Sequence, residues 1–106
     1  MAIRAIPEGF HRVTPYLTVQ GVARLIDFLK QAFEAEELER MPGPNGAVGH
    51  AQLKIGDSMV MMGEAASQEK AMRCAMYLYV NDTDACYKRA IAAGASSIMA
   101  PADQFY

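Results

Sequence analysis

The chain has 106 residues, of which 52% are hydrophobic and 21% are charged, a composition typical of one globular domain and unlike that of a disordered segment. Ten basic and twelve acidic side chains give a net charge of −2 with no basic stripe, which offers no electrostatic basis for binding nucleic acid or an acidic membrane. No run approaches the roughly 20 apolar residues of a membrane span, and the N-terminus lacks the apolar core of a signal peptide, so we expect a cytoplasmic protein.

The first predicted element is a strand at residues 12–20, where the side chains alternate with period two. The face expected to pack carries Val13, Leu17 and Val19, and the more polar face carries Thr14, Tyr16 and Thr18. Pro15 has no backbone N–H to donate, which favours an edge position for this strand.

A change of period predicts a helix over residues 21–33, because apolar side chains recur there at helical spacing. The stripe that they form consists of Val22, Leu25, Ile26, Leu29 and Phe33. A short strand is predicted next at 36–41, and the Pro and Gly residues of 42–46 predict an irregular loop.

Two further strands are predicted at 48–55 and 58–62. Gly56 and Asp57 lie between them, which is typical of a two-residue hairpin. Glu64 is expected to lie beyond the end of the second of these strands, at the start of a polar linker.

The second half of the chain predicts a strand at 74–80, a helix at 83–93 and a last strand at 96–100. Asn81 or Asp82 is expected to cap the start of the helix, and Gly94 is expected to end it. Cys74 and Cys86 are interpreted as small buried hydrophobic residues, with a disulfide or a thiol nucleophile as the alternative.

The two halves form a weak internal repeat. A shift of 61 positions places Tyr16-Leu17-x-Val19 on Tyr77-Leu78-x-Val80, and each match precedes a helix and then a strand. We therefore predict a single domain of residues 1–106 with an α+β fold of paired βαβββ modules, the first at 12–63 and an incomplete second at 74–106.

Five segments in this order resemble one known family: IPEGFHRVTPYLTVQG, FLKQAFEAEEL, GHAQLKIGDSMVMM, YLYVNDTDA and PADQFY. Over residues 6–106 the chain resembles the vicinal-oxygen-chelate superfamily, which includes glyoxalases, bleomycin resistance proteins and dioxygenases, and within it the PhnB-like branch. The resemblance implies curved sheets around a cavity. Family members continue beyond the position of Tyr106 by two strands, so the second module is expected to be truncated. Glu34 stands where relatives usually carry Gly, and is expected to tolerate a left-handed helix end.

The resemblance also implies where a metal would bind, since metal-dependent members place His, Gln or Glu on the first and last strands of each module. Thr14 and Ala75 occupy the first-strand positions, and neither is a useful ligand. The strand at 58–62 offers no carboxylate. We therefore expect neither a metal nor another cofactor.

A small-molecule cavity is the better-supported expectation. The residues predicted to bind the ligand are Thr14, Tyr16, Thr18, His50, Tyr77 and Tyr79, because they combine aromatic surface with hydroxyl groups. The alternative is that the tyrosines only pack on a sheet with their hydroxyl groups in solvent. His50 is either a half-exposed strand residue or a hydrogen-bonding group or general base in the cavity, and His11 is expected to lie in a turn or on the surface.

Three functions are compatible with these residues. The first is metal-independent binding of a small, partly aromatic molecule, and the second is a metal-dependent lyase, epimerase or dioxygenase. The third is a degenerate module that serves as a dimerisation unit. Catalytic residues are not identified, and whether the protein is an enzyme stays open. Because a truncated second module leaves a sheet edge unpaired, we expect a homodimer, with exchanged elements as one way to form it.

Overall fold

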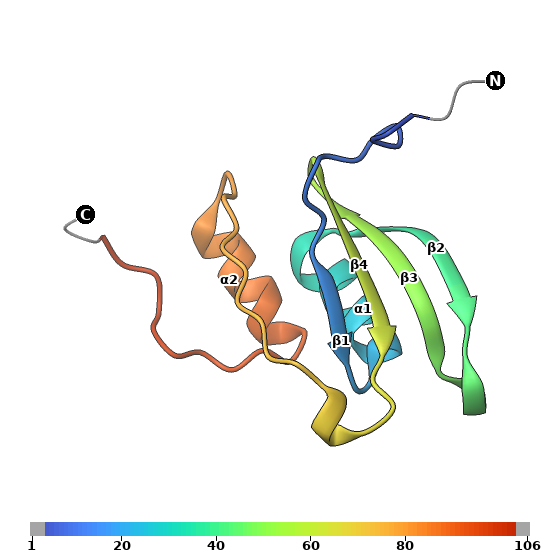
Figure 1. Ribbon diagram of the computed structural model, residues 1–106. Helices are drawn as coiled ribbons and strands as arrows, with labels where there is room; N and C mark the ends of the chain where they lie inside the picture. The colour runs from blue at the N-terminus through green and yellow to red at the C-terminus, as the bar shows by residue number, and fades with distance from the viewer. Residues whose placement is uncertain (1–3, 104–106) are drawn as a thin grey trace.

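A computed structural model describes residues 4–103 of the chain (Figure 1). Its elements, in order, are β1 (Tyr16–Val19), α1 (Val22–Phe33), β2 (Glu36–Pro42), β3 (Val48–Ile55), β4 (Ser58–Glu64) and α2 (Thr83–Ala92), with short 3-10 turns η1 (Pro44–Gly46) and η2 (Gln68–Lys70). The end of the predicted second module, residues 104–106, lies outside the described residues.

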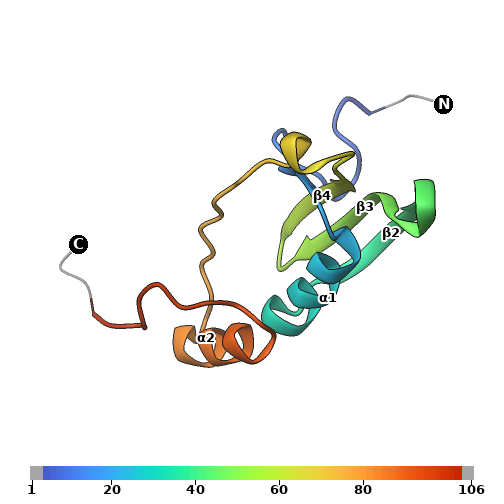
Figure 2. The ribbon, with the colours of Figure 1, turned by 90° about the horizontal axis from the view of Figure 1, so that it is seen from below.

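One four-stranded mixed sheet forms the body of the molecule, in the order β1-β4-β3-β2. β1 is parallel to β4, whereas β3 is antiparallel to both β4 and β2. α1 covers one face of this sheet, and α2 lies beside α1 (Figure 2). The order β1-α1-β2-β3-β4 is one βαβββ unit, which confirms the α+β fold class.

The core lies between α1 and the sheet. The predicted stripe of α1 is confirmed, because Val22, Ile26 and Leu29 are buried against the sheet. Leu53 on β3 and Met62 on β4 are fully buried in the same cluster. Burying a side chain of this size contributes about 1.5–3 kcal/mol, so each of these residues stabilises the packing of α1 on the sheet.

Both strands at the β1–β4 pair differ in length from the prediction. β1 begins only at Tyr16, and Val13 is 83% exposed rather than packed. Pro15 is at an edge as expected, and its carbonyl accepts the N–H of Met61 at 2.9 Å. The parallel ladder runs on to the pair Val19 and Glu64, so β4 includes Glu64, and the prediction that it lies beyond the strand is wrong.

The loop predicted as irregular at 42–46 contains the short turn η1, in which Asn45 has a left-handed backbone with φ 57°. Glu34 also adopts the left-handed conformation, with φ 56°, at the end of α1. That expectation is confirmed, and Arg89 of α2 lies 3.7 Å from the Glu34 carboxylate.

The two strands predicted in the second half are wrong for the part of the chain that the structure describes. Residues 74–80 are extended without forming a ladder, and residues 96–100 are irregular. Alternation predicts an extended backbone, but a strand also needs a partner, and neither segment pairs with the sheet. Cys74 is consequently exposed and not buried as expected.

The second predicted helix is confirmed as α2. Asp82 caps it, since its carboxylate accepts the N–H of Ala85 at 3.0 Å. Cys86 is buried as expected, with Sγ 3.8 Å from the carbonyl oxygen of Ala32 on α1. Neither α1 nor α2 is long and apolar enough to cross a membrane, within the described residues.

Candidate functional site

The face of the sheet opposite α1, called here the free face, carries the polar side chains of the predicted site. In β3 the buried residues Ala51 and Leu53 point toward α1, so His50 and Gln52 point away from it. Strand pairing aligns Gln52 with Met61 and Met61 with Tyr16, so these three residues form one row across the free face.

A polar chain joins three of these side chains. The Tyr16 hydroxyl oxygen lies 3.3 Å from His50 Nδ1, and Gln52 Nε2 lies 3.5 Å from His50 Nε2. When the Gln52 amide donates to Nε2, a neutral His50 carries its proton on Nδ1 and donates it to the Tyr16 oxygen. The hydroxyl proton of Tyr16 is then free to donate to a ligand.

Gly63 makes room for this arrangement. A Cβ atom at this position would lie 2.7 Å from the Tyr16 hydroxyl oxygen and 2.8 Å from the carbonyl oxygen of Gly49. The Tyr16 side chain therefore reaches over a position that only glycine can occupy without movement of a neighbour. Sequence reasoning missed Gly63, although a glycine inside a strand is a signal for close approach.

A cavity of about 520 Å³ adjoins the polar chain, where the N-terminal segment approaches the free face. From the sheet side it is lined by Gln52 and Met61, and from the N-terminal segment by the apolar side chains of Ile6 and Phe10 together with Arg12. Its volume is within the usual range for small-molecule sites. We call it the sheet-face cavity, and Gln52 connects it to the Tyr16–His50 pair.

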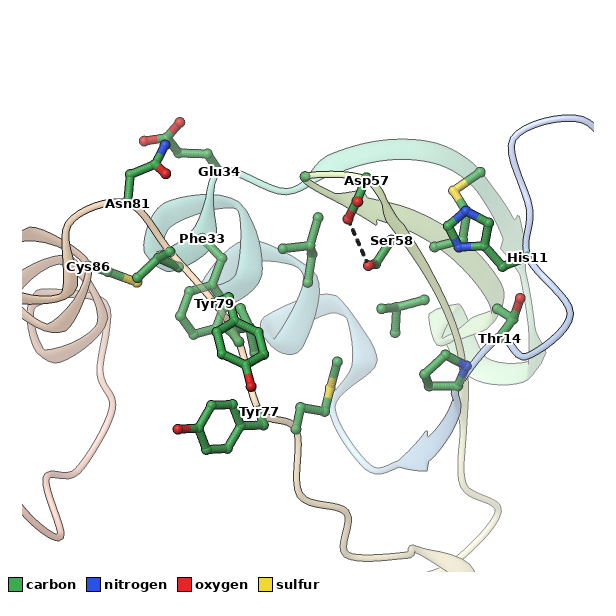
Figure 3. Close-up of a pocket in the computed structure, with 18 of the residues that line it drawn as sticks. His11, Thr14, Phe33, Glu34, Asp57, Ser58, Tyr77, Tyr79, Asn81 and Cys86 are labelled. Carbon is green, nitrogen blue, oxygen red and sulfur yellow. Dashed lines mark hydrogen bonds between the residues drawn. The ribbon is translucent and has the colours of Figure 1, made fainter. Parts of the chain in front are cut away.

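A second and wider space, the edge groove, has a volume of about 920 Å³ (Figure 3). It separates residues 13–15 and 58–60 at the sheet edge from the extended residues 75–82. Tyr77 and Tyr79 line one side of it, with ring centroids 5.3 Å apart. Figure 3 shows both rings on the extended segment, across the groove from Thr14.

The six predicted ligand-binding residues therefore fall into two groups. Tyr16 and His50 are in contact, and Thr18 shares the free face with Tyr16 by strand alternation. Tyr77 and Tyr79 are 80% and 93% exposed and lie across the groove. Thr14 lines both spaces. His11, expected in a turn or on the surface, is exposed and also lines both.

Glu64 belongs to the opposite face. Its carboxylate accepts the backbone N–H groups of Val22 at 3.0 Å and Gly21 at 2.9 Å. These two hydrogen bonds at the start of α1 hold the pKa of Glu64 below its ordinary value. The only acidic side chain of β4 is thereby committed to the helix and is not available to a ligand on the free face.

The donor set of the Tyr16–His50–Gln52 chain does not fit a divalent metal site of the kind that the resemblance implies. Among residues 4–103 there is no cluster of three or more His, Cys, Asp or Glu side chains that could hold a metal ion. Tyr16, His50 and Gln52 provide a single imidazole and no carboxylate, whereas divalent metal sites in proteins are built from several such groups.

Comparison with known families identifies the chain. Residues 9–106 match the model of the Glyoxalase/Bleomycin resistance protein/Dioxygenase superfamily, which confirms the resemblance seen in the sequence. A protein of Mycobacterium bovis, described as uncharacterised, is 37% identical over 117 aligned positions that include 100% of this chain and 74% of the relative. A Mycobacterium tuberculosis protein, also described as uncharacterised, has the same identity, with 66% of its length covered.

Solved structures share the fold. TioX from Micromonospora sp. ML1 is 24% identical with a TM-score of 0.62, covering 91% of this chain and 80% of its own. A gene product of Arabidopsis thaliana is 19% identical with a TM-score of 0.65, covering 87% and 80%. A PhnB protein from Bacillus cereus is 19% identical with a TM-score of 0.59, covering 78% and 72%. At these identities the likeness establishes the fold alone.

Proposed function

The chain belongs to the glyoxalase/bleomycin resistance protein/dioxygenase superfamily, and we propose that it binds a small, partly aromatic molecule on the free face of its sheet without a metal. The observation that carries the proposal is the Tyr16–His50–Gln52 chain beside the sheet-face cavity. A few placed polar groups next to apolar walls are the usual composition of a small-molecule site.

A metal-dependent lyase, epimerase or dioxygenase is the alternative from the same superfamily. It would need several metal-binding side chains close together, and residues 4–103 contain no cluster of three or more His, Cys, Asp or Glu side chains that could hold a metal ion. The Glu64 carboxylate also argues against this alternative, because it accepts backbone N–H groups at the start of α1 and is not available to a metal on the free face.

Isothermal titration calorimetry with a panel of small aromatic compounds, with and without EDTA, tests the proposal. We expect saturable binding that EDTA does not change. The Tyr16→Phe variant should bind about fivefold more weakly, because one hydrogen bond contributes on the order of 1 kcal/mol. Tyr87→Phe is the matched control, since the Tyr87 hydroxyl donates to Ser97 and Tyr87 lines neither cavity. Binding that requires added Zn²⁺ or Mn²⁺, or equal effects of both variants, would overturn the proposal.

We also propose that two copies associate through the edge groove. In this reading the incomplete second module serves as a dimerisation unit. Residues 74–80 are extended and unpaired, and they expose Tyr77 and Tyr79 beside a free sheet edge. Such edges favour pairing with another chain. Size-exclusion chromatography with light scattering should give about twice the chain mass of 11.6 kDa. A stable monomer at micromolar concentration would contradict the proposal.

We also propose that the protein is located in the cytoplasm, as the sequence leads us to expect. Fractionation of cells that express the tagged chain tests it, with the protein expected in the soluble cytoplasmic fraction and recovery from the membrane pellet as the contrary result.

A further inference from the structure

The charge around the sheet-face cavity differs from that of the whole chain. The chain carries two more acidic than basic residues. The cavity lining nevertheless contains one arginine, Arg12, and one histidine, His11, and no Asp or Glu. The local charge at the cavity is therefore positive in a protein that is acidic overall.

Arg12 is also free to bind an anion. Lys30 and Arg40 are paired with Glu37, and Arg89 is close to Glu34. Within residues 4–103, Arg12 has no such ion pair. Arg24 on α1 is unpaired as well, but it lines neither of the two cavities described above.

Two acidic side chains, Glu8 and Glu39, have neighbours in the cavity wall but lie outside the lining. Glu8 lies in the same N-terminal segment but is exposed and outside the lining. Glu39 on β2 is the cross-strand partner of the lining residue Gln52, but it is not itself part of the lining. No carboxylate therefore lines the cavity beside Arg12.

The remaining walls indicate what the anionic group is attached to. Ile6, Phe10 and Met61 give an apolar surface with one aromatic ring. The Thr14 hydroxyl and the Gln52 amide add hydrogen-bond donors without charge. A flat apolar body that carries one carboxylate matches this combination, with guanidinium and carboxylate as the natural pair.

From these observations we infer that the sheet-face cavity takes an aromatic carboxylate, with its apolar ring between Phe10 and Met61 and its carboxylate bound by Arg12. The inference rests on the proposed function, since it names the class of ligand for the same site. It makes Arg12 a residue that determines specificity.

Two probes of the same shape test the inference: 2-naphthoate, which is an anion at pH 7, and 2-naphthamide, which is neutral. Calorimetry on the full chain should show naphthoate binding about fivefold more tightly, as for a partly exposed ion pair. Arg12→Gln should remove about fivefold of the naphthoate affinity and leave naphthamide within about twofold. Arg24→Gln is the control, because it changes the net charge equally at a position outside the cavities.

The outcomes distinguish the preference for a carboxylate at Arg12 from the proposed binding of a small aromatic molecule. Equal affinity for both probes, or equal effects of the two arginine variants, overturns the inference while the proposed function stands. If neither probe nor any compound of the wider aromatic panel binds, both the inference and the proposed function are wrong. Circular dichroism confirms that both variants fold, which is expected because both arginines are exposed.

Discussion

Replacement of Gly63 by alanine tests the geometry of the site more directly than removal of any polar group. The new Cβ would lie 2.7 Å from the Tyr16 hydroxyl oxygen and 2.8 Å from the carbonyl oxygen of Gly49. The end of the Tyr16 side chain can move, whereas the Gly49 carbonyl belongs to the backbone of β3. Overpacking of this kind costs about 1–3 kcal/mol. Lower entropy of the unfolded chain offsets about 0.4–1 kcal/mol of that, so the net loss is centred at about 1.3 kcal/mol.

Urea denaturation of Gly63→Ala, Tyr16→Phe and the double variant forms a cycle that isolates the contact. Phe lacks the hydroxyl oxygen, so Gly63→Ala should destabilise the Tyr16→Phe background by less than the wild type, with a coupling of about 0.5–1 kcal/mol. The destabilisation that remains in the Tyr16→Phe background comes from the contact of the new Cβ with the Gly49 carbonyl oxygen. Displacement of Tyr16 from His50 should also weaken ligand binding in the single variant. If Gly63→Ala has the same stability and the same ligand affinity as the wild type, the Tyr16 side chain does not lie over Gly63.

Two further predictions concern the scaffold. Leu53→Ala removes a fully buried side chain and should lower the free energy of unfolding by about 2–5 kcal/mol in urea titration, and a loss below about 1 kcal/mol would contradict the core assigned here. Glu64→Gln removes the charge at the start of α1. Because the folded-state pKa of Glu64 is lowered below 4.5, its stabilisation is present above that pH and is lost as the pH falls through the folded pKa. Urea titrations should therefore show a larger deficit of the variant at pH 7 than at pH 3, and a deficit independent of pH would contradict the hydrogen bonds to Val22 and Gly21.

The features that the sequence predicts well are those that depend on local period. The helical spacing of Val22, Ile26 and Leu29 fixes which side of α1 is buried. Alternation in β3 places His50 opposite the core, and alternation in β1 does the same for Tyr16. Their contact depends in addition on the pairing of β1 with β4 and of β4 with β3, which the structure shows.

The features that the sequence did not predict depend on partners far apart in the chain. Gly63 is significant only because Tyr16 and Gly49 approach it from neighbouring strands. Glu64 joins β4 because the parallel ladder with β1 continues to Val19. The sheet-face cavity depends on how Phe10 and Arg12 approach the sheet, and no periodic pattern in the N-terminal segment indicates that.

The sequence predicts one cavity for all six ligand-binding residues, whereas the structure divides them between two spaces. The 61-residue repeat predicted that Tyr77 and Tyr79 would be placed as Tyr16 and Thr18 are. The helices of the two halves do correspond, since α1 and α2 both follow the repeated segment and pack together. The strand does not correspond, because residues 74–80 pair with no strand in the described chain and remain outside the sheet.

The central claim is that a small aromatic molecule binds to the free face of the sheet. A ¹H–¹⁵N correlation titration of the labelled chain with 2-naphthoate tests it residue by residue. We expect saturable shifts at Tyr16, His50, Gln52 and Gly63, with residues 77–80 unmoved. Shifts confined to residues 77–80, or no saturable shift with any compound of the aromatic panel, would contradict it.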